Sequence, residues 1–230
     1  ISLIEEAQQQ GADGILLAPA NSNALVESCQ KIKNQNISLV LIDSSINGDA
    51  YDTCYMTGNM EAGQIAAREM LAMLSEQGNT DQDPLEVGIL LSSDSSQAMV
   101  NRVSGFLEYW ANYAPEKWTI NQDIRLNGGD MENAQANVSE LLRNNSHIKG
   151  LYGCNNTSTK GIAAVLMRAA RKDIVMAGFD LAEETASLIR DPDYHGITLL
   201  QKQDHPGRKA GTKIYRYRST AGGQRLSFGE

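Results

Sequence analysis

Four apolar segments of the chain each run into a side chain that forms hydrogen bonds. In an open α/β sheet the loops beyond the carboxyl ends of the strands converge on one crevice, and ligands bind there. Aspartate accepts hydrogen bonds, whereas the amides of Asn and Gln both donate and accept, so the set matches a ligand dense in hydroxyl groups. The four side chains are Asp43, Asn155, Asp180 and Gln201.

A second interpretation applies to each of these residues taken alone. An Asp or Asn that follows a strand often caps the next helix, because its side-chain oxygen accepts from a free backbone N–H. Capping explains the whole set less well than it explains any single member. Arg102, in the sequence NRVSGF, is a fifth candidate, because the first turns of a helix favour anions over cations. An exposed surface arginine is the alternative for Arg102.

The segments that would position these residues alternate between two patterns. Continuous apolar runs are typical of strands covered on both faces, and the longer segments between them are amphipathic, as in NMEAGQIAAREMLAML at residues 59–74. This alternation predicts an open parallel sheet, or two of them. Strands are expected at residues 14–18, 38–43, 86–92, 148–154, 173–179 and 196–201.

Composition excludes several classes of protein. The 230 residues are 41% hydrophobic, enough for the core of one large or two small domains. The net charge of −8 argues against a nucleic-acid-binding domain, and we interpret the basic residues 208–218, RKAGTKIYRYR, as the solvated face of a terminal helix. No apolar run approaches the ~18 residues of a membrane span. The first residues, ISLIEEAQQQ, read as the middle of a helix rather than as a signal peptide.

Motifs for catalysis or metal binding are absent from the sequence. There is no G-x-S-x-G, no P-loop and no G-x-G-x-x-G, and no histidine has a second ligand at metal spacing. Cys29, Cys54 and Cys154 are widely spaced and are expected to be buried thiols. We therefore expect a protein that is not an enzyme and that uses no metal or cofactor.

Seven segments, in this order, resemble a known family. They are GADGILLAP, NISLVLID, GNMEAGQIAAREML, NRVSGF, GLYGCNNTSTKGIAAVL, IVMAGFD and ITLLQ. Together they resemble type I periplasmic binding proteins, specifically the ribose/galactose-type sugar-binding proteins of ABC importers, over nearly the whole chain. The resemblance implies an α/β fold of two Rossmann-like lobes with parallel sheets, joined by a hinge, and a sugar clamped in the cleft between them.

Carried over motif by motif, the resemblance places the same five residues in the sugar pocket. Asp43 matches the acid of the first lobe, and Arg102 matches the arginine ahead of the GF pair. Asn155 matches the asparagine of the family's ND motif, Asp180 the aspartate of GFD, and Gln201 the hinge glutamine. An arginine and two carboxylates in one pocket can orient each other around a shared ligand hydroxyl.

The resemblance also implies how the chain divides between the lobes. It crosses near Thr57-Gly58 and again near Gln201-Lys202, so the first lobe is residues 1–57 plus 202–230 and the second is residues 58–201. Closure of the lobes on the ligand is then a hinge motion that a transporter or a sensor detects.

Three features depart from the family. Its first strand and helix have no counterpart before Ile1, and the C-terminal STAGGQRLSFGE does not resemble the usual closing strands. The second-lobe position that usually offers an aromatic ring to the sugar falls near Gly129, and Ser44 stands where sugar binders carry a basic residue. The chemical identity of the ligand stays open for this reason.

The function that the resemblance implies is extracytoplasmic solute binding. Such a protein, periplasmic or held at the cell surface as a lipoprotein, captures a sugar or related polyol and delivers it to an ABC-transporter permease. The alternative is the ligand-sensing domain of a regulator, either the effector domain of a lac-type repressor or the input domain of a sensor kinase. In the second case the partner of the chain is a membrane sensor. The segment ETASLIRDPDYHGITLLQ resembles the transport branch more than the repressor branch.

Overall fold

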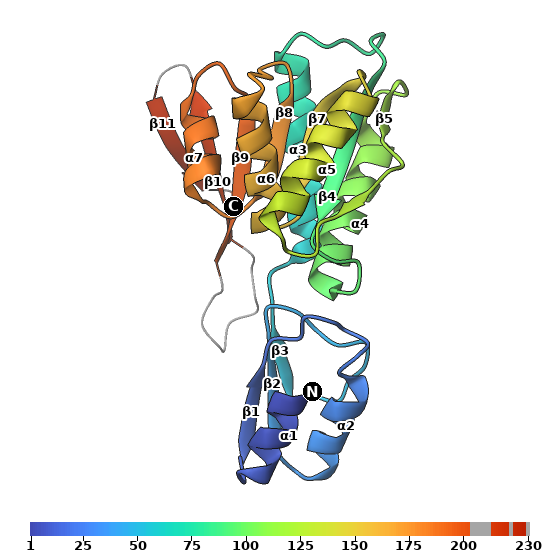
Figure 1. The fold of residues 1–230 in the computed structure, drawn as a ribbon, viewed down its shortest axis with the longest axis vertical. Helices are drawn as coiled ribbons and strands as arrows, with labels where there is room; N and C mark the ends of the chain where they lie inside the picture. The colour runs from blue at the N-terminus through green and yellow to red at the C-terminus, as the bar shows by residue number, and fades with distance from the viewer. Residues whose placement is uncertain (203–212, 221–222, 229–230) are drawn as a thin grey trace.

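A computed structural model describes residues 1–202, 213–220 and 223–228 of the chain (Figure 1). Among these residues the strands form two sheets, one of three strands and one of eight. All six strands expected from the sequence are present, within one or two residues of the expected bounds. We call the elements from α1 to β3 the first lobe and those from α3 to β11 the second lobe.

The first lobe is a small parallel sheet covered by two helices. Its strands lie in the order β1-β2-β3, and Ile4 of the first helix and Ile32 of the second are buried against Leu39 and Leu41 of the central strand. The elements are α1 (Ser2–Gln9), β1 (Gly14–Leu17), α2 (Val26–Asn34), β2 (Ser38–Ile42) and β3 (Thr53–Tyr55).

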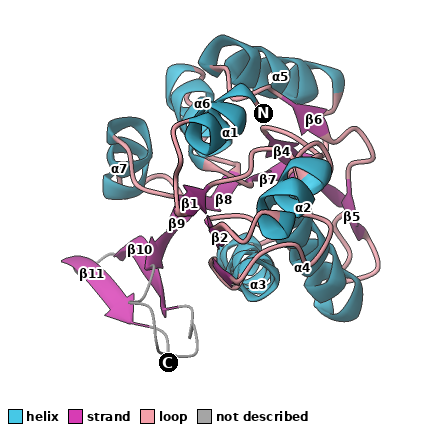
Figure 2. Ribbon diagram, turned by 90° about the horizontal axis from the view of Figure 1, so that it is seen from below, coloured by secondary structure: helices cyan, strands magenta, loops and turns pink. Residues whose placement is uncertain are grey.

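The second lobe is a larger sheet with helices on both faces, as Figure 2 shows. Strands β5, β4, β7, β8 and β9 are parallel neighbours. One hydrophobic cluster joins them to α3 and α4, and a second joins them to α5, α6 and α7. Every residue of β8 is buried, which is why the sequence of this strand is apolar throughout.

The bounds of the second lobe's elements follow. They are α3 (Asn59–Glu76), β4 (Leu85–Leu91), α4 (Gln97–Tyr113), β5 (Trp118–Ile120), β6 (Arg125–Leu126), α5 (Met131–Asn144), β7 (Ile148–Gly153), α6 (Asn156–Arg168), β8 (Val175–Phe179), α7 (Glu183–Arg190), β9 (Gly196–Lys202), β10 (Lys213–Thr220) and β11 (Gly223–Phe228).

The C-terminal residues differ from two expectations. The basic segment at 208–218 was expected to be helical, but residues 213–220 form β10, which pairs antiparallel with β9. The alternation of polar residues with Ile and Tyr in KIYRYRST favours a strand over a helix, because these residue types fit a pleated surface. Residues 202–230 were expected in the first lobe, yet the described strands β10 and β11 extend the sheet of the second lobe. The other expected lobe bounds stay a prediction.

Helices α3 and α4 approach each other closely at two glycines. A Cβ atom on Gly63 would lie 2.1 Å from the Arg102 carbonyl oxygen, and one on Gly105 would lie 2.0 Å from the Met60 carbonyl oxygen. Both distances fall far inside van der Waals contact, so only glycine allows this separation of the two backbones. The contact fixes the position of α4, and therefore of Arg102, against the rest of the second lobe.

The substitution Gly63→Ala should destabilise the protein by about 1–3 kcal/mol, because the added methyl overlaps a backbone atom that no rotamer change can move away. Urea unfolding followed by circular dichroism measures the change. Gly14→Ala is the matched control, since a Cβ there meets the Ser38 carbonyl oxygen at an ordinary 3.7 Å. An equal free energy of unfolding for Gly63→Ala and the wild type would show that this close helix contact is not formed.

Candidate ligand-binding pocket

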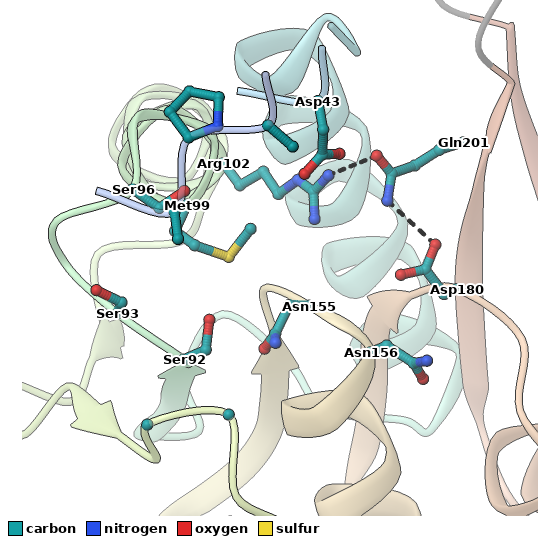
Figure 3. Close-up of a pocket in the computed structure, with 15 residues that line it drawn as sticks. Asp43, Ser92, Ser93, Ser96, Met99, Arg102, Asn155, Asn156, Asp180 and Gln201 are labelled. Atoms are coloured by element: carbon teal, nitrogen blue, oxygen red, sulfur yellow. Dashed lines mark hydrogen bonds between the residues drawn. The ribbon is translucent and has the colours of Figure 1, made fainter. Parts of the chain in front are cut away.

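A cavity of about 750 Å³ lies at the carboxyl ends of the strands, and residues of both lobes line it (Figure 3). Its volume falls within the roughly 300–1,000 Å³ that is usual for small-molecule sites. All five residues singled out from the sequence line this cavity: Asp43, Arg102, Asn155, Asp180 and Gln201. Their role in ligand binding stays a prediction.

Arg102 is buried at the inner wall of the pocket, with 2% of its surface exposed, so the alternative of an exposed surface arginine is wrong. Its Nε donates to Asn59 Oδ1 at 2.8 Å, and one terminal nitrogen donates to the Cys154 carbonyl oxygen at 2.9 Å. The other terminal nitrogen donates to Gln201 Oε1 at 2.7 Å. These bonds use three of the five N–H donors of a guanidinium group.

Arg102 continues into a chain of bonds along one side of the pocket. Gln201 Oε1 accepts from both Arg102 and Thr57 Oγ1, the latter at 2.9 Å, and this fixes the orientation of the amide. Gln201 Nε2 then donates to Asp180 Oδ1 at 3.1 Å. Figure 3 shows the Arg102–Gln201 and Gln201–Asp180 bonds as dashed lines. A cation, an amide and a carboxylate are thereby joined into one array.

The electrostatics of the pocket centre on the same guanidinium. Burial lowers the pKa of Arg102 from its usual value, while the acidic groups of Tyr152, Asp180 and Asp43 act in the opposite direction. Arginine stays protonated in proteins, so the side chain carries its charge at neutral pH. Its guanidinium carbon lies 3.9 Å from the centre of the Phe179 ring, and this cation–π contact partly replaces the lost hydration.

Asp43 and Asp180 share an unusual backbone conformation. Their φ angles are +66° and +64°, in the left-handed region that Asp tolerates better than most residues other than glycine. In both, the backbone N–H still bonds to the neighbouring strand, Asp43 to the Tyr55 carbonyl oxygen and Asp180 to that of Leu199, each at 2.9 Å. Each strand therefore turns sharply at the point where its carboxylate reaches the pocket.

Asn155 fits both interpretations of a polar residue after a strand. It is the N-cap of α6, since its Oδ1 accepts from the Ser158 backbone N–H at 3.3 Å and from the Ser158 hydroxyl at 2.6 Å. It also lines the pocket. Because the cap uses the oxygen, the amide nitrogen is the group that Asn155 can offer to a ligand.

The sequence reasoning missed several residues that line the pocket. The loops after β1 and β4 also start at the carboxyl ends of parallel strands, so the same rule applies to them. They supply small and hydroxyl-bearing side chains to the pocket. No aromatic ring is among the described residues that line the cavity. The additional residues are Ala18, Pro19, Ala20, Ser92, Ser93, Ser96, Met99, Gly128 and Asn156. Gly129 also lines the cavity, where the resemblance had placed it.

In the part of the chain that the structure describes, no group of three or more His, Cys, Asp or Glu side chains is arranged to hold a metal ion. None of its helices is long and apolar enough to cross a membrane. All three cysteines are free, with Cys29 and Cys154 buried, and burial raises the pKa of the Cys154 thiol.

Comparison with known proteins assigns the chain to a family. The sequence model described as "Periplasmic binding protein domain" matches residues 1–218. The chain belongs to the periplasmic binding proteins. A D-apiose import binding protein of Actinobacillus succinogenes is 27% identical over 179 residues, which are 77% of this chain and 54% of that protein. Another from Paraburkholderia graminis is 24% identical over 220 residues, 95% of this chain and 67% of that protein.

A solved periplasmic binding protein has the same fold. The ABC transporter solute binding protein of Agrobacterium vitis with bound D-fucose is 26% identical and superposes with a TM-score of 0.77, over 87% of this chain and 67% of that one. The present chain spans between about half and two thirds of the length of the two curated relatives named above.

The capping role of Asn155 can be tested by measuring the stability of the protein. Asn155→Ala should lower the free energy of unfolding by about 1 kcal/mol, since it removes the cap of α6. Asn155→Asp retains the capping oxygen and should unfold at nearly the wild-type urea concentration. If both variants are equally destabilised, the amide nitrogen rather than the cap is the group that stabilises the fold.

Proposed function

We propose that this chain is the ligand-binding part of an extracytoplasmic solute-binding protein, which captures a sugar or related polyol between its lobes for uptake by an ABC transporter. The observation that carries the proposal is the bonded array of Arg102, Gln201 and Asp180 at the wall of a cavity lined from both lobes. A ligand that contacts this array in the second lobe and Asp43 in the first lobe links the two lobes, which favours their closure.

The donors and acceptors of the pocket suit vicinal hydroxyl groups. Each hydroxyl both donates and accepts, so it can donate to a carboxylate and accept from an N–H of Arg102 at the same time. Asp43 approaches from the first lobe and Asp180 from the second. A ligand with several hydroxyls can therefore satisfy both carboxylates together, whereas a ligand with one cannot.

The relatives support the same class of ligand. Two curated relatives are named as D-apiose import binding proteins, one as a ribose import binding protein and one as a xylitol-binding protein. The similar structure from Agrobacterium vitis contains D-fucose. These are binding proteins rather than enzymes, so the partners we propose for this chain are a small polyol and a transporter permease.

The proposal is tested by thermal unfolding in the presence of D-apiose, D-ribose, xylitol and D-fucose, with hexoses and inositols as further members of the panel. A ligand at about 100 times its Kd should add ~2.7 kcal/mol to the free energy of unfolding and raise the Tm. Isothermal titration calorimetry of each hit gives the Kd. If no sugar or polyol raises the Tm, the ligand class is wrong.

Asp180→Asn should weaken binding of the sugar identified in that screen by about ten- to hundredfold, because a hydrogen bond to a charged group contributes roughly 1.5–3 kcal/mol. Asparagine keeps the shape of the side chain and tolerates the left-handed backbone, so the fold should be retained. Calorimetry measures the Kd, and Asp81→Asn at an exposed position is the charge-matched control. An unchanged Kd would remove Asp180 from the binding site.

A further inference from the structure

The N-terminus of α4 is capped from the other lobe. Ser96 is the N-cap residue of this helix, yet its side chain forms no capping bond within the helix. Gln97 N donates instead to Ser22 Oγ at 3.0 Å, and Ala98 N donates to Ser44 Oγ at 3.4 Å. Ser22 and Ser44 belong to loops of the first lobe, so two first-turn N–H groups of α4 are satisfied across the interface.

Ser22 is held firmly on its own side of this interface. Its hydroxyl donates to the Ser45 carbonyl oxygen at 2.7 Å, and its own carbonyl oxygen accepts from Asn47 N at 2.9 Å. Its backbone N–H reaches the second lobe and donates to the Ser95 carbonyl oxygen at 2.9 Å. Ser22 and Ser44 are each only 2% exposed. These hydrogen bonds and the burial of both serines make this a specific contact between the lobes.

The capped helix is the one that presents the pocket residues of the second lobe. Ser96, Met99 and Arg102 all line the cavity and lie at or within the first two turns of α4. An N-cap serine normally uses its own hydroxyl to bond the N–H groups of the first turn. Because the other lobe supplies those acceptors, the Ser96 hydroxyl does not have to accept from the first-turn N–H groups. It can form a hydrogen bond to a ligand instead.

We propose that Ser22 and Ser44 form a latch that caps α4 only when the lobes are closed, and that they set the affinity of the pocket without contacting the ligand. This inference rests on the proposed function, because it assumes that the lobes open and close around a ligand, with the closed form still populated in the ligand-free protein. In the open form Ser96 caps the helix itself, and in the closed form the latch replaces it. The two serines are positioning residues, which favour the closed state before any ligand binds.

The latch predicts a defined energetic coupling. A ligand that binds only the closed form has an apparent Kd equal to its intrinsic Kd divided by the closed fraction. Loss of one buried hydrogen bond across the interface should lower the ratio of closed to open molecules about fivefold, and the apparent Kd should rise as the closed fraction falls.

Hydrogen exchange of the ligand-free protein tests the latch without any sugar. In Ser22→Ala the amide of Gln97 should lose protection by about fivefold or more, and in Ser44→Ala the amide of Ala98 should do so, as resolved by NMR. Ser45→Ala is the matched control, because its backbone carbonyl, which accepts from Ser22, is retained. Ser22→Thr keeps a hydroxyl at the same place and should restore protection of Gln97.

The outcomes separate the latch from the proposed function. Wild-type protection at Gln97 and Ala98 in both Ala variants would overturn the latch, whether or not a sugar binds. Lost protection in the variants, with no sugar bound by the wild type, would support the latch as an interlobe contact and overturn the polyol ligand. If a sugar binds with an equal Kd to the wild type, Ser22→Ala and Ser44→Ala, the coupling of the latch to affinity is refuted.

Far-UV circular dichroism and the Tm establish that each variant is folded, and either serine suffices for the test if the other variant does not fold.

Discussion

The structure of the pocket depends on the burial of one charged group, the guanidinium of Arg102. A cation removed from water is strongly destabilising unless hydrogen-bond acceptors and polarisable groups surround it. Here Asn59 from α3, the Cys154 carbonyl after β7 and Gln201 from β9 supply the acceptors, and Phe179 from β8 supplies the ring. Four elements that are remote in sequence must therefore meet at one point, and the glycine contact between α3 and α4 lets them do so.

This arrangement ties the binding site to the fold. Gln201 is held by Arg102 and Thr57, and it in turn holds Asp180, so the carboxylate offered to a ligand is oriented before the ligand arrives. Preorganisation of this kind increases affinity because fewer side chains have to be ordered on binding. The inference about Ser22 and Ser44 extends the argument to α4, whose first turn completes its hydrogen bonds only through the other lobe.

The local sequence was sufficient to predict an element where the preference of the residues for that structure is itself local. Apolar runs become strands because each residue is buried on a covered sheet, and this predicted six strands and the polar residues at four of their ends. It was insufficient at the C-terminal segment, where a basic run was interpreted as a helix although its alternation favours the strand β10. The short strands β3, β5 and β6 were also missed, because two or three residues give too little periodicity to recognise.

The sequence by itself determined the α/β alternation, the family and the five polar residues that line the pocket, since each follows from residue types within a few positions of one another. Only the tertiary structure decided what those residues do together. It placed Arg102 in the interior instead of on the surface, gave Asn155 a cap and a pocket position at once, and brought Ser22 to the end of α4. For Arg102 and Ser22 the physical reason is that their hydrogen-bond partners lie 99 and 75 residues away, which no local pattern encodes. The cap of Asn155 is local, and only its position in the pocket depends on the fold.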